Sequence, residues 1–312
     1  MTAFLQLDLP ALIGASFAAL SCALVGNFLV LTRRAMVSDA LSHVMLPGVL
    51  AAFMLTGTTA VVAMLAGGVG AALVAVGLVS FLIRTAKVEP SAALGVVFTT
   101  LFAAGVLAME QSGIARTAFD VHHVITGNLE ALVWPTATGI GSLFSLSELA
   151  EMPRALGRLA AILLLVAAIV ALAQKELALV AFDPDFARAS GLPVGALDLL
   201  LLVATALASV AAFESVGVVL AVAMIVCPPA TARLFTQTLP AQIRLSCALA
   251  LLSVFLGYAV ATLGPQALGY DIALNAAGMI GAVSGLMFGA AVMHRSWTLA
   301  RLSGRETLSL SS

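Results

Sequence analysis

The sequence predicts an all-α, polytopic membrane protein with about nine transmembrane helices. Hydrophobic residues make up 62% of the 312 residues and charged residues only 9%, whereas a soluble domain carries about 25% charged residues. Apolar runs of about 20 residues, long enough to cross a bilayer as a helix, recur along the chain. Arginine and lysine gather in alternate connections between these runs, as expected for connections in the cytoplasm. We expect residues 1–312 to form a single transmembrane domain.

Nine segments have the length and hydropathy of a membrane span, with eight as the alternative count. They cover residues 11–32, 36–55, 59–83, 91–109, 155–174, 196–213, 216–235, 244–263 and 276–293. Basic residues flank every second connection, at Arg33 and Arg34, Arg84 and Lys87, Lys175 and Arg188, Arg233 and Arg244, and Arg295, Arg301 and Arg305. This pattern places the N-terminus outside the cytoplasm and the C-terminus inside it. Arg116, Arg154 and Arg158 are exceptions, because they fall on the outer side.

The outer segment, residues 110–154, is the least membrane-like part of the chain. It holds a weaker candidate metal site, where Asp120 precedes the adjacent histidines His122 and His123. Adjacent residues on a helix diverge by about 100°, so the two histidines are poor ligands for the same ion. The simpler interpretation is that they are ordinary exposed or interface histidines.

The second span carries an aspartate and a histidine within "MVSDALSHVMLPGVLAAFML", residues 36–55. A charged side chain at the centre of a bilayer costs about 2.5 kcal/mol or more, so the pair needs a compensating role. Asp39 and His43 are four residues apart, which brings both onto one face of a helix. A carboxylate oxygen and an imidazole nitrogen together suit Mn²⁺, Fe²⁺ or Zn²⁺. One chain supplies only two ligands, so a second copy or a similar subunit would complete the site.

Two other interpretations of this pair remain open. Asp39 and His43 could form a buried hydrogen bond that ties two helices together, or they could relay protons. If the pair binds metal, the imidazole must be neutral, so transport is expected to fall as His43 becomes protonated in acid.

Motifs for nucleotide binding and hydrolysis are absent from the sequence. There is no G-x-x-x-x-G-K-[ST], no H-E-x-x-H and no G-x-S-x-G, so the chain is not expected to be an enzyme. The cysteines Cys22, Cys227 and Cys247 lie inside apolar runs, which favours buried thiols over a soft-metal site. We expect no permanently bound cofactor. The net charge of −1 does not suggest binding to nucleic acid.

A short amphipathic helix is predicted between the fifth and sixth spans, over about residues 183–191. Asp183, Pro184 and Asp185 suit a helix start, and Gly191 suits its end. Phe182 and Phe186, four residues apart, are available to a partner surface, and Arg188 adds a positive charge. The competing interpretation is a simple turn between two helices.

Three stretches in order along the chain resemble the membrane permease subunits of ABC importers for manganese, zinc and iron. "VSDALSHVMLPGVL" resembles the family's second-span motif, and "FDPDFARASGLPVGALDLLL" resembles its coupling loop. "SVGVVLAVAMIVCPPATARLF" resembles a later span, although Pro228 and Pro229 stand where the family usually has one proline. We expect a local kink there rather than lost function. The resemblance covers nearly the whole chain.

This resemblance implies a type II-like importer permease in a bacterial inner (cytoplasmic) membrane. Asp39 and His43 would correspond to a pair implicated in binding metal along the pore. The segment from Asp183 to Gly191 would correspond to the helix that docks on the ATPase, so a partner subunit would hydrolyse ATP. Other implied partners are a second permease subunit, identical or sister, and an extracytoplasmic metal-binding protein.

The transported metal is expected to be Mn²⁺, with Zn²⁺ or Fe²⁺ as alternatives. The preference rests on "GNLE", residues 127–130, which looks more like the manganese and iron branch of the family. The main rival function is a proton-coupled secondary metal transporter that needs no ATPase. The predicted helix at 183–191 argues against that rival.

Overall fold

The computed structural model describes residues 4–58, 61–111, 129, 132–136, 151–267, 269 and 274–309, and regular secondary structure in these residues is helical. A short π-helix, η1 (Phe4–Asp8), leads into the first long helix. The long helices are α1 (Leu9–Leu31), α2 (Met36–Thr56), α3 (Val61–Ala86), α4 (Pro90–Gln111), α7 (Arg154–Phe182), α9 (Val194–Val216), α10 (Val218–Phe235), α11 (Leu239–Ala267) and α12 (Ala276–Ser309), and α8 (Pro184–Ala189) is short. The prediction of an all-α polytopic protein is therefore confirmed.

Each long helix coincides with one of the segments predicted from hydropathy. Eight helices in the described part of the chain are long and apolar enough to cross a membrane. The ninth long helix, α2, contains the apolar stretch His43–Thr56, and Asp39 lies in its first turn.

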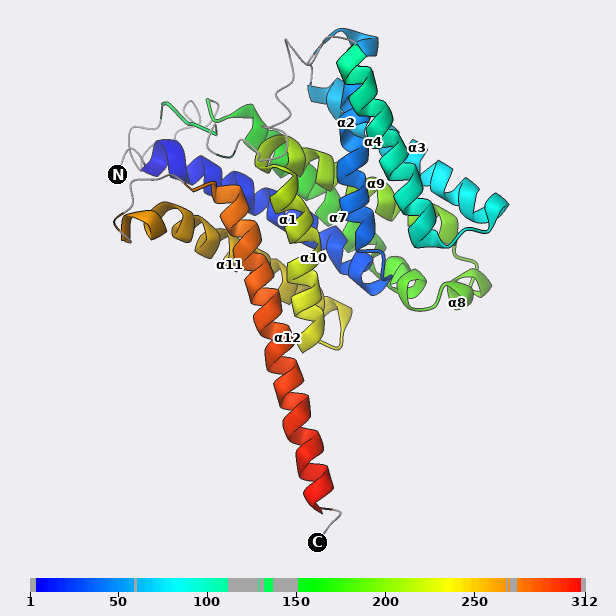
Figure 1. The fold of residues 1–312 in the computed structure, drawn as a ribbon, viewed down its shortest axis with the longest axis vertical. Helices are drawn as coiled ribbons and strands as arrows, with labels where there is room; N and C mark the ends of the chain where they lie inside the picture. The colour runs from blue at the N-terminus through cyan, green and yellow to red at the C-terminus, as the bar shows by residue number, and fades with distance from the viewer. Residues whose placement is uncertain are drawn as a thin grey trace.

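Several helices extend beyond their predicted ends. The span predicted at 155–174 is the helix α7, which continues through Lys175 and Glu176 to Phe182. Hydropathy windows stop at charged residues, whereas Lys and Glu are good helix formers. The last helix, α12, continues to Ser309 and projects away from the other helices (Figure 1).

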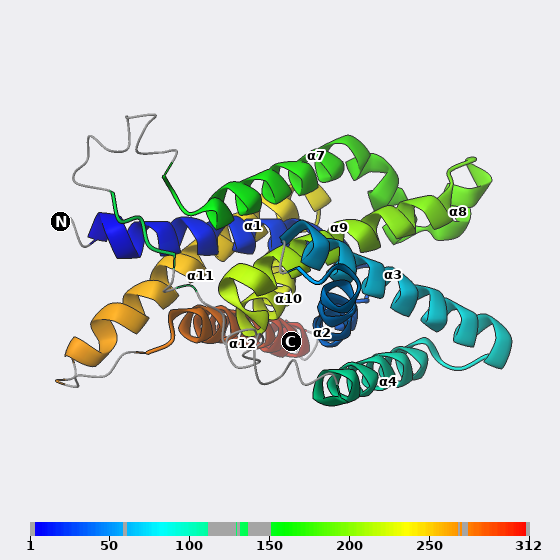
Figure 2. The same ribbon diagram turned by 90° about the horizontal axis from the view of Figure 1, so that it is seen from above.

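The helices form two groups joined by α9 and α10. In the first group, α1 contacts α7, α9, α10 and α11, while α12 packs on α10 and α11. In the second group, α2, α3 and α4 pack against one another, and α2 and α3 also contact α9. Figure 2 shows α7 running beside α1, with α3 and α4 on the other side of the molecule. The helix that carries Asp39 and His43 therefore lies at the junction of the two groups.

Two glycine contacts bring helices unusually close together. A Cβ atom added to Gly26 of α1 would lie 2.0 Å from the carbonyl oxygen of Ile225 in α10. Where α2 crosses α3, a Cβ atom on Gly48 would lie 2.5 Å from the Gly67 oxygen, and one on Gly67 would lie 2.4 Å from the Gly48 oxygen. Small residues allow such close approach of membrane helices. These crossings fix α10 against α1 and α2 against α3.

The basic clusters expected on one side of the membrane meet at one end of the bundle. Arg34, after α1, lies 3.4 Å from Asp198 near the start of α9. The Arg233 guanidinium carbon lies 6.0 Å from the Phe182 ring centroid. Arg295 of α12 donates a 2.6 Å hydrogen bond to the Leu234 carbonyl. These contacts place the start of α9 and the ends of α1, α7 and α10 together, as the charge pattern predicts.

Candidate functional site

The Asp39–His43 pair occupies the first two turns of α2. Their closest side-chain atoms, Asp39 Oδ2 and His43 Nε2, are 4.0 Å apart, which is longer than a hydrogen bond between such atoms. The Asp39 side chain is 57% exposed and that of His43 51% exposed. Both residues belong to the same helix and are half exposed, so their mutual contact is not a buried bond between two helices.

The first two turns of α2 have an open face in the part of the chain that the structure describes. Met36 is 69% exposed, and the spacing from Met36 to Asp39 to His43 keeps all three on one side of the helix. Leu50, two turns after His43 on the same face, is buried, and the other buried residues of α2 are Val37, Ala40, Val44, Met45 and Val49. The open face is therefore confined to the start of α2, where it presents the pair.

Helix α4 supports the pair from the side. The rings of His43 and Phe102 meet edge to face, with centroids 5.5 Å apart and planes at 74°. One turn further along α2, a Cβ atom on Gly105 would lie 2.7 Å from Pro47 Cβ. The aromatic contact restricts the imidazole, and the glycine lets α4 approach the proline.

The spacing of the two ligand atoms is close to what a shared divalent ion requires. With metal–ligand bonds of about 2.1 Å, a tetrahedral ion holds two ligand atoms about 3.4 Å apart, so the 4.0 Å gap closes with a small side-chain movement. The described residues contain no group of three or more His, Cys, Asp or Glu side chains able to hold a metal. If the pair binds a metal, as the sequence predicts, these two side chains supply only part of its ligands among the described residues.

The weaker candidate site lies outside the residues that the structure describes. Asp120, His122 and His123 all fall in that part of the outer segment. Their role as an additional metal site therefore stays a prediction.

The short helix between the fifth and sixth spans is present as α8. Asp183 caps its start by accepting a 2.9 Å hydrogen bond from the Phe186 backbone N–H, and Pro184 occupies the first turn. Asp185 and Arg188 form a 2.6 Å ion pair on its surface. Gly191, at φ 82°, turns the chain toward α9, a backbone conformation that glycine adopts at little cost. The helix spans Pro184–Ala189, so the predicted bounds include its cap and its exit turn.

Two aromatic side chains, one at the end of α7 and one within α8, are largely exposed. Phe182 and Phe186 are each 58% exposed, whereas Ala187 is fully buried. Exposed rings flanking a short helix at the basic end of the bundle form a surface suited to a partner.

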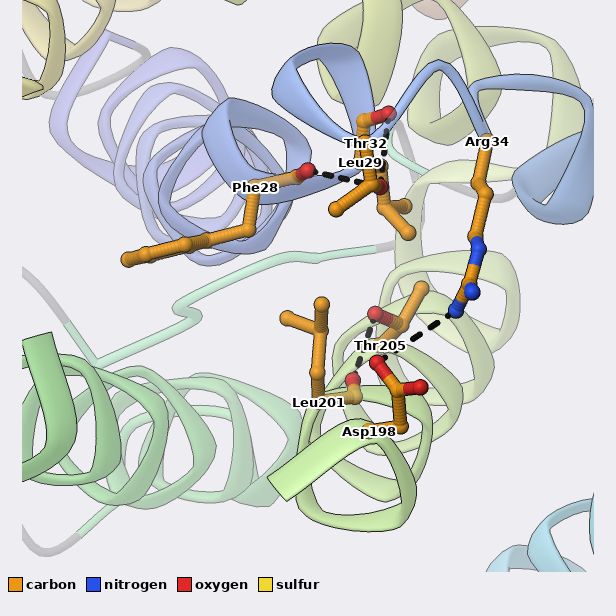
Figure 3. A network of polar contacts seen from close by, with 7 residues as sticks. All are labelled: Phe28, Leu29, Thr32, Arg34, Asp198, Leu201 and Thr205. Atoms are coloured by element: carbon orange, nitrogen blue, oxygen red, sulfur yellow. Dashed lines mark hydrogen bonds and ion pairs between the residues drawn. The ribbon is translucent and has the colours of Figure 1, made fainter. Parts of the chain in front are cut away.

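The sequence analysis did not predict a polar contact between α9 and the turn that leads into α2. Figure 3 shows the Arg34 guanidinium reaching Asp198 of α9, one turn before the buried Leu201–Thr205 hydrogen bond. Arg33, at φ 58°, ends α1, and the Arg34 N–H donates to the Leu29 carbonyl. This helix-ending turn aims Arg34 at α9. The sequence did hold a signal for this contact, because Asp198 is the one acidic residue in the predicted span 196–213 and therefore needs a polar partner.

Comparison with known proteins gives one consistent match. A family model described as "ABC 3 transport family" matches residues 4–136 and 149–295. The chain is 38% identical to the manganese transport system membrane protein MntD of Bacillus subtilis over 242 residues, covering 78% of this chain and 79% of the relative. It is 31% identical to the zinc transport system membrane protein TroC of Treponema pallidum, covering 77% and 74% of the two chains.

Solved structures agree with this match. PsaBC from Streptococcus pneumoniae, in complex with a Fab, superposes with a TM-score of 0.70 at 25% identity and covers 90% of this chain and 89% of that chain. The structure described as "An inward-facing conformation of a putative metal-chelate type ABC transporter" shares the fold, with a TM-score of 0.59 at 16% identity and coverage of 94% of this chain and 88% of that chain.

Proposed function

The chain belongs to the ABC 3 transport family, and on that premise we propose that it is the membrane permease subunit of an ATP-driven importer of divalent transition metal ions. Manganese is the favoured cargo, because relatives at 38% and 33% identity are manganese transport system membrane proteins. Zinc is an alternative cargo, since zinc transport system membrane proteins match at 31% identity. Iron is the remaining alternative, because aspartate and histidine ligands suit all three ions.

The observation that carries this proposal is the open face of α2. Ionisable side chains within membrane helices face a bundle interior or a water-filled passage rather than lipid. Asp39 and His43 are half exposed in the single chain, so a partner must cover them. A second permease, identical or sister, would bring two more ligands to the same ion.

The proposed pathway assigns one task to each part of the chain. An extracytoplasmic binding protein releases the ion into the pore, where Asp39 offsets part of its charge and neutral His43 donates a nitrogen. The ligands must release the ion as well as hold it, so the site should have moderate affinity. We place the permease with these partners in a bacterial inner membrane.

Helix α8 is the proposed docking element for ATPase subunits. The exposed rings of Phe186 in α8 and of Phe182 at the end of α7 would enter a groove on the partner. The helix is followed directly by α9, whose Asp198 contacts Arg34 just before α2. An exposed ion pair of this kind adds only about 0–1 kcal/mol of stability. We therefore propose that the ion pair between Arg34 and Asp198 transmits a movement of α8 and α9 to α2, the helix that carries the proposed metal ligands.

Metal uptake should require the ATPase. We would measure radiolabelled Mn²⁺ uptake in cells that express the chain with its binding protein, with and without the ATPase, using Zn²⁺ and Fe²⁺ as competitors. Uptake is expected only with an ATPase able to hydrolyse ATP. The extent to which Zn²⁺ or Fe²⁺ reduces Mn²⁺ uptake would rank the three ions as cargo. Equal uptake without the ATPase would instead indicate the proton-coupled secondary transporter.

Replacing Phe186 by glutamate should uncouple the permease from the ATPase. The ring is 58% exposed, so its loss should leave the fold intact. The glutamate carboxylate would be buried, unpaired, in the interface with the ATPase, which disfavours docking. Co-purification of the ATPase should fall at least roughly tenfold, as truncation of a central aromatic contact commonly costs about 2 kcal/mol or more.

The matched control is Phe186→Leu, which keeps an apolar side chain and should retain most of the docking. Normal ATPase recovery with Phe186→Glu would show that α8 is only a turn between helices.

A further inference from the structure

Two buried carboxamide side chains lie where α1 packs against α11. Asn27 of α1 and Gln242 of α11 are both fully buried. Asn27 Nδ2 donates a 2.7 Å hydrogen bond to Ser246 Oγ of α11. Gln242 precedes Ser246 by four residues, which places both on one face of α11. The two carboxamides therefore lie about one helical turn apart along the contact between the two helices.

The hydrogen bonds of Asn27 use its side-chain nitrogen and leave its oxygen unpaired. Asn27 Nδ2 also donates to the Ala23 carbonyl at 2.7 Å, and a carbonyl only accepts, so this nitrogen and the side-chain oxygen cannot be exchanged. Ser246 Oγ donates to the Ile243 carbonyl, so it acts as an acceptor toward Asn27. Asn27 Oδ1 is buried, and no described residue donates a hydrogen bond to it.

Gln242 has an unpaired carboxamide although its backbone is satisfied. Its backbone N–H donates a 3.0 Å hydrogen bond to the Thr238 carbonyl. Its side-chain atoms Oε1 and Nε2 are both buried without a hydrogen bond to the part of the chain that the structure describes. Burying an amide in this way costs free energy, and buried polar groups in proteins are nearly always paired with protein or with ordered water. The contact between α1 and α11 thus presents two acceptors and one donor that need a partner.

We propose that ordered water binds between Asn27 and Gln242 and links α1 to α11. A water molecule both donates and accepts hydrogen bonds, so it can pair with Asn27 Oδ1, Gln242 Oε1 and Gln242 Nε2 together, and buried waters typically make about three such bonds. Gln242 lies in the first turn of α11, two residues before the exposed Arg244. The site is therefore near the basic end of the bundle, where water has access.

A monovalent cation is the competing occupant of this site. The two carboxamide oxygens could bind it, but the Gln242 Nε2 donor would then stay unpaired, and neither carboxamide carries a charge to balance the ion. A direct hydrogen bond from Gln242 Nε2 to Asn27 Oδ1 would in turn leave Gln242 Oε1 unpaired. Water accounts for all three atoms. The inference rests only on the packing of α1 against α11, so it stands independently of the transported metal.

The first test is the thermal stability of the purified full-length chain with Gln242→Met. Methionine resembles glutamine in shape but lacks the carboxamide, so the bound water and Asn27 Oδ1 would lose partners and the melting midpoint should fall by about 3 °C or more. An unpaired carboxamide predicts the opposite sign, because an apolar group would then replace an unsatisfied one. The control Gln237→Met makes the same change at an exposed position between α10 and α11 and should leave the midpoint unchanged.

A second variant tests whether the two residues share the water. Asn27→Ala and Gln242→Met together should lower the midpoint by less than the sum of their separate effects, because either change alone breaks the bridge. An experimental structure that resolves ordered water should show it within hydrogen-bonding distance of Asn27 Oδ1 and the Gln242 carboxamide. A raised or unchanged midpoint for Gln242→Met, additive effects, or a direct bond between the carboxamides would overturn the proposal. So would a midpoint that is higher in Na⁺ or K⁺ than in choline, which would indicate a bound cation.

Discussion

Asp39→Asn is expected to abolish metal uptake while leaving a folded permease. Asparagine keeps the size of the side chain and one carbonyl oxygen, but it removes the negative charge that faces the ion. Two unit charges 4 Å apart interact by about 4 kcal/mol at an effective dielectric constant of 20, and a divalent ion in direct contact gains more. Uptake should therefore fall at least roughly a hundredfold, measured with radiolabelled Mn²⁺ in cells that also express the ATPase and the binding protein.

The control for this variant lies one turn away on the same face of α2. Met36 is 69% exposed, so Met36→Ala changes the open face without removing a ligand and should leave uptake nearly normal. Both variants should express and bring down the ATPase equally well. A folded, ATPase-bound Asp39→Asn protein with normal uptake would mean that the ions pass elsewhere and that the pair has another role.

Hydropathy and short-range signals were sufficient to predict most of the helical framework. Each predicted span became a helix because a backbone crossing lipid must satisfy its hydrogen bonds internally. Helix α8 was predictable for a local reason, since Asp183, Pro184 and Gly191 specify its start and exit within a few residues. Asp39 and His43 stood out because their polarity is costly in such a segment.

Contacts between helices distant in the sequence could not be predicted in the same way. Asp198 was visible as an isolated charge, but its partner Arg34 is 164 residues away, and only the packing of α9 against α1 and α2 brings the two together. The exposure of the Asp39–His43 face also depends on which sides of α2 are covered by α3, α4, α9 and α10. A single sequence does not specify these neighbours.

The close crossing of α1 and α10 is another contact of this kind, and it predicts the largest effect on stability. Pro229 has no N–H, so the Ile225 carbonyl four residues earlier lacks its usual partner within the helix. The helix α10 nevertheless continues unbroken from Val218 to Phe235, with both prolines inside it. Gly26 approaches the Ile225 carbonyl so closely that any side chain would collide with it.

Gly26→Leu should therefore prevent stable folding. Even a single Cβ atom would lie 2.0 Å from the Ile225 oxygen and 3.0 Å from the Pro229 ring, and neither the backbone oxygen nor a ring inside a buried helix can move aside. We expect a loss of more than about 3 kcal/mol, the upper range for overpacked cores, seen as aggregation in detergent size-exclusion chromatography. The control Gly77→Leu adds the same side chain where a Cβ atom meets nothing within 4 Å, and it should elute as the wild type does. A monodisperse Gly26→Leu protein with unchanged thermal stability would show that α1 and α10 do not approach this closely.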